Sequence, residues 1–272
     1  MRPTSVFLSS SLIPGTTVSA ATQQFRDNGI THVEWSGGHV AEARSTTEVL
    51  SSATERLTSR LHNYFPPPDT DFVLNLASAD RKIASLSIAH VEKALQISAA
   101  LGASKYGVHA GFLFDPIPAQ LGRPLSGVSL YDRQEAVDRF VERYLALQDL
   151  GVSMGVQLYV ENNVLSEANA RTFDGQKAMM LLDGEDWYEL HDAGVRNLLL
   201  DLAHLKVSCN SLGRDYGEEA RRLFGLSDYI HVSEPADDAD TNEPVVDWDG
   251  VLAPVQDLPW QEKDVTVEVH SS

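Results

Sequence analysis

Ionisable residues stand at the ends of short apolar runs in this chain, where a buried strand would ordinarily continue with Val or Ile. They carry carboxylate or imidazole groups, which can transfer protons or bind a divalent metal ion. One such residue is more often a satisfied hydrogen-bonding group, but several uncompensated ones at one place would be costly to bury. A metal ion is the natural compensation, and this mixture of ligands suits Zn, Mn, Co, Fe or, with fewer imidazoles, Mg. The residues are Glu34, His62, His109, Glu161, Asp201, His204, His231 and Glu268.

The elements that carry these residues must all end at one place for the side chains to meet. Apolar strands alternate with amphipathic helices, such as those expected at 83–103 and 136–150, which indicates a parallel sheet of βα units. Eight strands without a break in composition predict one closed (β/α)8 TIM barrel over residues 1–272. The strands are expected at 5–12, 31–36, 60–65, 106–112, 156–162, 198–202, 229–233 and 265–269.

Irregular residues are concentrated in the connections from a strand to the next helix. Three of these, at 111–130, 163–176 and 234–249, are long and rich in Gly, Pro, Asp and Asn. In a barrel they all lie on the C-terminal face, where active sites are built. The sequence ends soon after the eighth strand, so we expect the last outer helix to be lacking; either the chain is truncated or another copy of it, in a homo-oligomer, covers the gap.

The composition narrows the class of partner. The 272 residues are 43% hydrophobic and 22% charged, as in a soluble globular chain. With 21 basic and 39 acidic residues the net charge is -18, which disfavours nucleic acid and anionic membranes. Cys209 is the single cysteine and no apolar run reaches the length of a membrane span, so a cytoplasmic location is expected.

Eight segments, in order along nearly the whole chain, resemble the xylose-isomerase-like barrels, which include endonuclease IV, hexulose epimerases and sugar phosphate isomerases/epimerases. Each segment alone is a weak signal, but the ordered set is specific for the fold. The segments are 29–38 (GITHVEWSGG), 61–64 (LHNY), 75–78 (NLAS), 107–111 (GVHAG), 160–163 (VENN), 201–206 (DLAHLK), 230–233 (IHVS) and 265–268 (VTVE).

The resemblance implies one divalent ion held by Glu161, Asp201, His231 and Glu268. In the epimerase branch the two glutamates also face opposite sides of the substrate. One removes a proton next to a carbonyl and the other returns it, while the metal polarises the oxygens and stabilises the enediolate. His204 would bind a substrate oxygen.

In the nuclease branch, residues that match His62 and His109 join Glu161 in holding another metal. A third metal would use His204 and an Asp-x-His pair in the seventh loop, where this chain has Asp240-Thr-Asn242. Because an amide is a much poorer zinc ligand than an imidazole, Asn242 makes the third site doubtful.

The predicted substrate is a small carbohydrate, with or without a phosphate group. Further residues are expected to bind it. Basic residues of the strand-to-helix loops would bind a phosphate or carboxylate if several converge, and are scattered surface charge otherwise. Those loop residues are Arg44, Arg123, Arg171, Lys206 and Arg214, and the expected substrate-binding set is His204, Lys206, His109 and Glu34.

The predicted function is therefore a metal-dependent sugar or sugar phosphate isomerase or epimerase. The alternative is a divalent-metal phosphoesterase of the endonuclease IV type, which would need two or more metals. A dehydratase or lyase is a related alternative, because such an enzyme also forms an enolate intermediate, as the isomerase or epimerase does. A non-catalytic barrel would require a decayed site, which the four intact ligand positions argue against.

Overall fold

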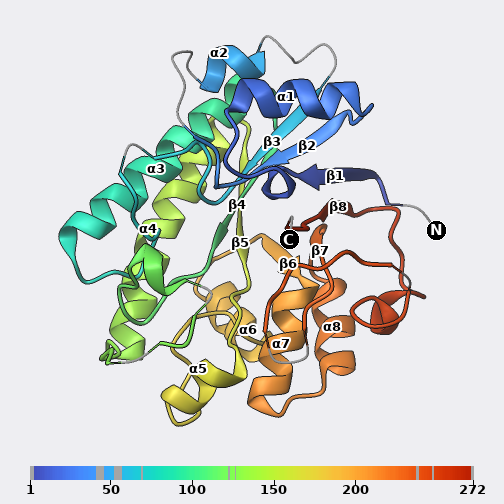
Figure 1. Cartoon of the computed structure of the whole chain (residues 1–272). Helices are drawn as coiled ribbons and strands as arrows, with labels where there is room; N and C mark the ends of the chain where they lie inside the picture. Colours follow the sequence, from blue (N-terminus) through green and yellow to red (C-terminus); the bar gives the residue numbers. More distant parts are fainter. Residues whose placement is uncertain are drawn as a thin grey trace.

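The computed structural model describes residues 3–40, 46–51, 57–68, 70–121, 123–125, 127–236, 239–246 and 248–270. Eight parallel strands pair in chain order and β8 pairs with β1, so the sheet is a closed barrel (Figure 1). The predicted (β/α)8 barrel is confirmed, although each strand ends earlier than expected, because its last residues already belong to the following loop or, after β1 and β6, to a helix. The strands are β1 Ser5–Ser9, β2 His32–Trp35, β3 Thr58–His62, β4 Lys105–His109, β5 Gln157–Glu161, β6 Leu198–Asp201, β7 Tyr229–Val232 and β8 Asp264–Val267.

The outer layer of helices runs around the barrel from α1 and α2 through α3 and α4 to α7 and α8 (Figure 1). Side-chain caps define several helix starts, and Asp80, for example, accepts hydrogen bonds from the backbone N–H groups of Lys82 and Ile83. The α-helices are α1 Val18–Asp27, α2 Thr46–Ser51, α3 Arg81–Ala100, α4 Arg133–Ser153, α5 Glu167–Thr172, α6 Gly184–Asp192, α7 Leu202–Leu212 and α8 Tyr216–Phe224. Short 3-10 helices lie at Ser10–Leu12 (η1), Pro118–Gln120 (η2) and Ala253–Val255 (η3).

The outer layer is thinnest beside β8 and β1. Between β7 and β8 the described residues contain only the short helix η3, and Trp260 behind it packs against Phe224 of α8 with ring centroids 4.8 Å apart. No helix follows β8 in the described part of the chain, which ends at residue 270. Consistent with this, Val6 on the outer face of β1 is 52% exposed.

The lumen of the barrel is filled by side chains that point inward from the strands. A small cluster of Tyr159, Leu199 and Tyr229 lies there, separate from the main core between strands and helices. Arg60 of β3 is also buried, and its guanidinium lies 3.8 Å from the centroid of the Phe7 ring and 4.0 Å from that of Tyr229. This packed layer supports the residues at the C-terminal ends of the strands. No helix among the described residues is long and apolar enough to cross a membrane.

Candidate active site

The C-terminal ends of the strands bring the predicted residues together. His62, His109, Glu161 and Asp201 are the last residues of four successive strands, β3 to β6. The strand register places His109 beside Glu161. It likewise places Asp201 beside His231 of β7. Because parallel strands of a barrel end at one mouth, these side chains meet there.

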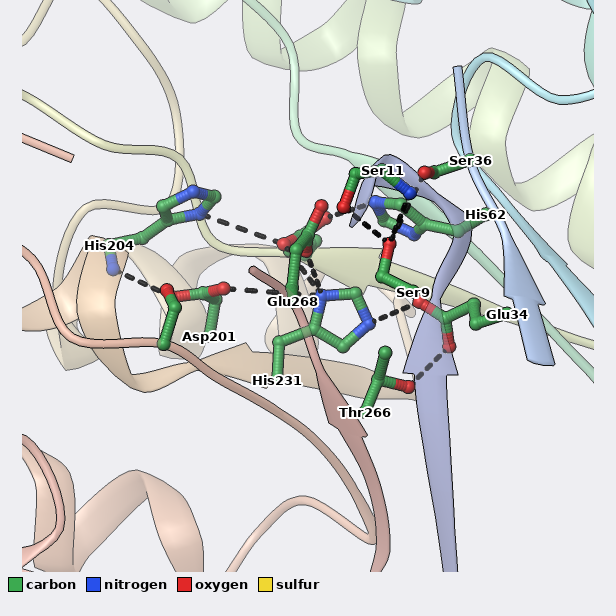
Figure 2. A network of polar contacts seen from close by, with 12 residues as sticks. Ser9, Ser11, Glu34, Ser36, His62, Asp201, His204, His231, Thr266 and Glu268 are labelled. Carbon is green, nitrogen blue, oxygen red and sulfur yellow. Dashed lines mark hydrogen bonds and ion pairs between the residues drawn. The ribbon is translucent and has the colours of Figure 1, made fainter. Parts of the chain in front are cut away.

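His231 lies at the centre of a ring of carboxylates (Figure 2). Its Nε2 is 2.7 Å from Glu34 Oε1, and its Nδ1 is 2.8 Å from Glu268 Oε2. The same Nδ1 is 3.5 Å from Glu161 Oε1 and 4.0 Å from Asp201 Oδ2. Burial lowers the pKa of His231, but the carboxylates, Glu34 above all, raise it well above its usual value.

Glu161 is shared by two groups of side chains that could hold a metal ion. Its Oε2 is 3.1 Å from His62 Nε2 and 3.5 Å from His109 Nδ1, and its Oε1 is 3.6 Å from His204 Nδ1. In each group the ligand atoms lie within 4.8 Å of one another. The first group is His62, Glu161, His231 and Glu268, and the second is His109, Glu161 and His204.

The unsatisfied atoms of the cluster fit a bound cation. Both carboxylate oxygens of Glu161 and Oδ2 of Asp201 are buried, and no described group gives them a well-formed hydrogen bond. Burial raises the pKa of Asp201 to about 7, an effect that His204 opposes and the charge of Glu161 reinforces. Buried carboxylates that lack hydrogen bonds are stable only if protonated or compensated by positive charge. The carboxylate and imidazole set therefore suits a divalent ion of the Zn, Mn, Co or Fe type.

The seventh loop completes the site through Asp240 and Asn242. Asp240 Oδ2 lies 3.1 Å from His204 Nε2 and accepts a hydrogen bond of 3.1 Å from Asn242 Nδ2. Asn242 Oδ1 in turn accepts a hydrogen bond of 3.3 Å from the Ser233 hydroxyl. Asn242 thus orients Asp240, a structural role that agrees with the poor ligand strength of an amide.

Glu34 differs from its expected role as a substrate-binding residue. Its side chain has no exposed surface, and its Oε2 accepts hydrogen bonds from Arg60 Nε at 2.7 Å, Thr266 Oγ1 at 2.6 Å and the Tyr229 hydroxyl. Burial opposes ionisation, but the charges of His231 and Arg60 hold the pKa of Glu34 far below its usual range. Glu34 is thus held by these three side chains against His231 Nε2, and it does not line the cavity described below.

Lys206 also differs from its expected role, because it forms an ion pair with Glu234 at 2.8 Å and does not line the cavity described below. The other loop cations do not converge either. Arg171 pairs with Glu167 on α5, and Arg214 pairs with Glu185 at 2.7 Å. Arg44 lies outside the described residues, so Arg123 remains as the loop cation that the structure places at the cavity.

Two features of the site were not predicted from the sequence. One is the support beneath Glu34 from Arg60, Tyr229 and Thr266, which a charged residue inside an apolar strand could have signalled. The other is His270, which lines the cavity. His270 follows Glu268 by two residues and so lies just after the end of β8. The sequence alone gave no reason to distinguish it from a surface histidine.

A cavity of about 540 Å³ opens over the second group of ligands. His109, His204 and Asp240 lie on its wall, whereas Glu161, Asp201 and His231 lie below the surface. Loops after β3, β4, β5 and β7 supply the rest of the wall, which includes Tyr64, Phe114, Asn169 and Asn242. The ionisable cluster is therefore the floor of a ligand-sized pocket.

The sequence profile of xylose isomerase-like TIM barrels matches residues 23–272, and the chain belongs to this family. No functionally curated protein matches it by sequence. Among solved structures it is similar to a D-tagatose 3-epimerase-like protein (TM-score 0.69, 14% identity, 98% of this chain and 91% of that one). It is also similar to an L-ribulose 3-epimerase (0.67, 15%, 100% and 82%). A third similar structure is an AP endonuclease, family 2, from Brucella melitensis (0.64, 12%, 99% and 94%). At these identities the likeness shows a shared fold.

Proposed function

We propose that this chain is a metal-dependent isomerase or epimerase that acts on a sugar or sugar derivative by proton transfer. The observation that carries the proposal is the position of two glutamates at one imidazole: Glu161 and Glu268 both approach Nδ1 of His231, at 3.5 and 2.8 Å. Two carboxylates at one imidazole, just beneath the cavity, can remove and return a proton next to a carbonyl. The structures named as 3-epimerases that share this fold support the same reading.

Proton transfer and binding of the substrate oxygen are assigned to different residues. Glu161 or Glu268 accepts the proton from the carbon beside the carbonyl, and the other carboxylate, in its protonated form, delivers a proton to the same carbon or its neighbour. His204 faces the cavity with one imidazole edge and is held by Asn162 O at 2.9 Å and by Asp240. It is therefore placed to hold a substrate oxygen while the proton moves.

Glu161, Asp201, His231 and Glu268 would hold the divalent ion, with His62 beside them. When bound, such an ion polarises substrate oxygens and offsets the negative charge that develops on them. Glu34 fixes the orientation of His231. Its carboxylate contacts Nε2, so Nδ1 points toward Glu161 and Glu268.

The proposal is tested by isotope exchange in D2O. Protein loaded with Mn²⁺ or Zn²⁺ is incubated with a panel of ketoses, and deuterium uptake beside the carbonyl is followed by proton NMR. We expect uptake that EDTA abolishes and that falls at least 100-fold in Glu161→Gln and in Glu268→Gln. The control is Glu234→Gln, whose carboxylate pairs with Lys206 outside the cluster. Uptake that survives both cluster substitutions would refute the assignment.

A second function, a divalent-metal phosphoesterase, is favoured by the group of His109, Glu161 and His204, which offers a second metal position. Two features argue against a phosphoesterase. The basic residues of the loops do not gather at the cavity, and Asn242 has an amide where a third metal site would need an imidazole. Hydrolysis of bis-p-nitrophenyl phosphate separates the two activities. The combined substitution His62→Ala and His109→Ala would abolish a two-metal hydrolase but leave an isomerase with one metal appreciably active.

A further inference from the structure

The cavity over the site is larger than a single sugar ring needs. Its volume of about 540 Å³ lies in the range of pockets that enclose drug-sized ligands. It extends from the ligand cluster to a second hydrophobic cluster that is separate from the main barrel core. The loops after β4 and β5, together with α5, form this second cluster, so it lies on the C-terminal face beside the reacting end of the cavity.

The two ends of the cavity differ in chemistry. At the ligand end, Oδ1 of Asn63 and Oδ1 of Asp240 are buried and accept no hydrogen bond from the described groups, so they can accept from hydroxyl groups. Another part of the cavity wall, which we call the apolar wall, is formed by apolar side chains. It consists of Leu74, Phe112, Phe114, Leu125 and Met179.

Several polar groups beside the apolar wall already form hydrogen bonds within the protein. The Tyr64 hydroxyl accepts a hydrogen bond from Leu74 N at 2.6 Å, and Asn169 Oδ1 accepts one from Leu125 N at 2.8 Å. Asn163 Nδ2 donates to the backbone oxygens of Ala110 and Met180, at 2.8 and 3.0 Å. A hydroxyl placed here would lose its hydrogen bonds to water and find few replacements, which disfavours a second polar ring.

The charges of the cavity wall and of the whole chain disfavour a large substrate that carries a phosphate. Among the described residues that line the cavity, Arg123 is the only lysine or arginine. A phosphate is ordinarily bound by several converging cations or backbone N–H groups, and the remaining loop cations that the structure describes are paired elsewhere. With a net charge of -18, the chain also repels anions at long range.

We infer that the substrate is a ketose or keto-sugar that carries an uncharged apolar group of about the size of an aromatic ring, and that an aryl glycoside, which lacks the carbonyl, binds as a non-reacting analogue. The hydroxyl-bearing part of the substrate lies at Asn63, His109, His204 and Asp240, and its apolar part lies on the apolar wall. The assignment of the reacting end rests on the proposed function, whereas the preference for an apolar group rests on the wall alone. Ring-edge contacts with Phe112 and Phe114 would hold an aromatic group there.

The test compares matched pairs of methyl and phenyl glycosides of glucose, galactose and mannose, titrated calorimetrically into protein that holds its divalent metal. We expect the phenyl compound to bind about tenfold or more tightly than the methyl compound in at least one pair, because only the phenyl ring reaches the apolar wall. Phe112→Ala, at a half-buried position, should bring that ratio close to one. The matched control is Ile117→Ala, since Ile117 lies in the same loop, is 58% exposed and does not line the cavity.

If Phe112→Ala does not fold, Leu121→Ala asks the same question, because Leu121 lines the cavity and is 43% exposed. Equal affinity within every pair would overturn the inference, and so would a phenyl preference that no cavity substitution reduces. The proposed function fails independently: deuterium uptake that is absent from the metal-loaded protein, or that survives substitution of Glu161 and Glu268, refutes proton transfer, whereas the methyl-to-phenyl ratio reports only on the apolar wall.

Discussion

At the scale of single residues, the site depends on the contact between Glu34 and His231. The imidazole has two nitrogen atoms, and the carboxylate of Glu34 at 2.7 Å from Nε2 determines which of them faces the other carboxylates. Carboxylate partners of this kind fix the ring orientation and increase the basicity of a metal-binding histidine. We therefore expect Glu34 to act through His231, because Arg60, Thr266 and Tyr229 hold its other carboxylate oxygen.

Glu34→Gln should weaken binding of Mn²⁺ or Zn²⁺ about 10- to 100-fold, the usual effect of removing such a partner. The dissociation constant is measured by competition with a chelator, and circular dichroism checks that the barrel is folded. Asp264→Asn is the matched control because Asp264 also faces Arg60, at 3.6 Å, but has no contact with His231. An equal loss of affinity in both variants would show that the effect comes from Arg60 and the lumen, not from the orientation of His231.

At the scale of elements, Gly107 of β4 leaves room in the lumen for side chains from two other strands, β3 and β6. A Cβ at this position would lie 2.5 Å from Leu199 Cδ1 and 3.1 Å from His62 Nδ1. The lumen is closely packed, so one side chain must move if a methyl group is added. Since His62 belongs to the first ligand group, the packing of β4 and the geometry of the site are coupled.

Gly107→Ala should therefore lower the free energy of unfolding by about 1–3 kcal/mol and also weaken metal binding. Urea unfolding and the chelator competition measure the two effects. Gly225→Ala is the control, because its Cβ would meet only Arg222 O at an ordinary 3.7 Å. Loss of stability without a change in metal affinity would mean that Leu199, and not His62, gives way.

A second element-scale feature is the buried ion pair at the start of α6. Asp183 caps this helix through Asp186 N at 3.1 Å, and its other oxygen lies 2.8 Å from Lys177 Nζ. Burial, the largest single influence, raises the pKa of Asp183, but the hydrogen bonds from Lys177 and Asp186 N and the charges of Lys177 and Arg214 together lower it, so the net shift is downward. A lowered folded-state pKa gives stability that is complete above the unfolded value of about 3.9 and is lost as pH falls toward the folded value.

Asp183→Asn keeps a capping side chain but removes the charge, so it should cost about 1–3 kcal/mol at pH 7. The difference from the unsubstituted protein should be the same at pH 5 and smaller at pH 3, as urea unfolding at the three values will show. Asp257→Asn, in a fully exposed pair with Arg221, should change little. A difference for Asp183→Asn that stays constant to pH 3 would contradict the assignment.

At the scale of the whole molecule, the alternation of strands and helices was sufficient to predict the barrel and the residues at its mouth. Periodicity places His62, His109, Glu161 and Asp201 at strand ends, and closure of the sheet brings them together. Periodicity does not describe loops or pairings across the lumen. Glu34 and Lys206 were therefore expected at the substrate, whereas Arg60 and Glu234, distant in sequence, pair with them.

The candidate ligands around Glu161 lie between the end of β3 and the end of β8, so an ion bound there would link strands that are distant in the sequence. An ion that binds only the folded state stabilises it by about 2.7 kcal/mol at a concentration 100 times its dissociation constant. For a domain of this size we expect Tm to rise by about 5 °C or more when Mn²⁺ or Zn²⁺ is added to EDTA-treated protein. Scanning calorimetry measures the rise, and elemental analysis counts the ions.

Glu161→Gln should abolish this rise, since Glu161 belongs to both ligand groups, whereas His62→Ala should reduce the response of the first group alone. Glu234→Gln should respond to metal as the unsubstituted chain does, because Glu234 pairs with Lys206 outside the cluster. One ion per chain would support the isomerase or epimerase, and two ions would favour the phosphoesterase. If metal leaves Tm unchanged, the buried carboxylates are balanced by protons on His204 and His231, and the barrel is a non-catalytic member of its family.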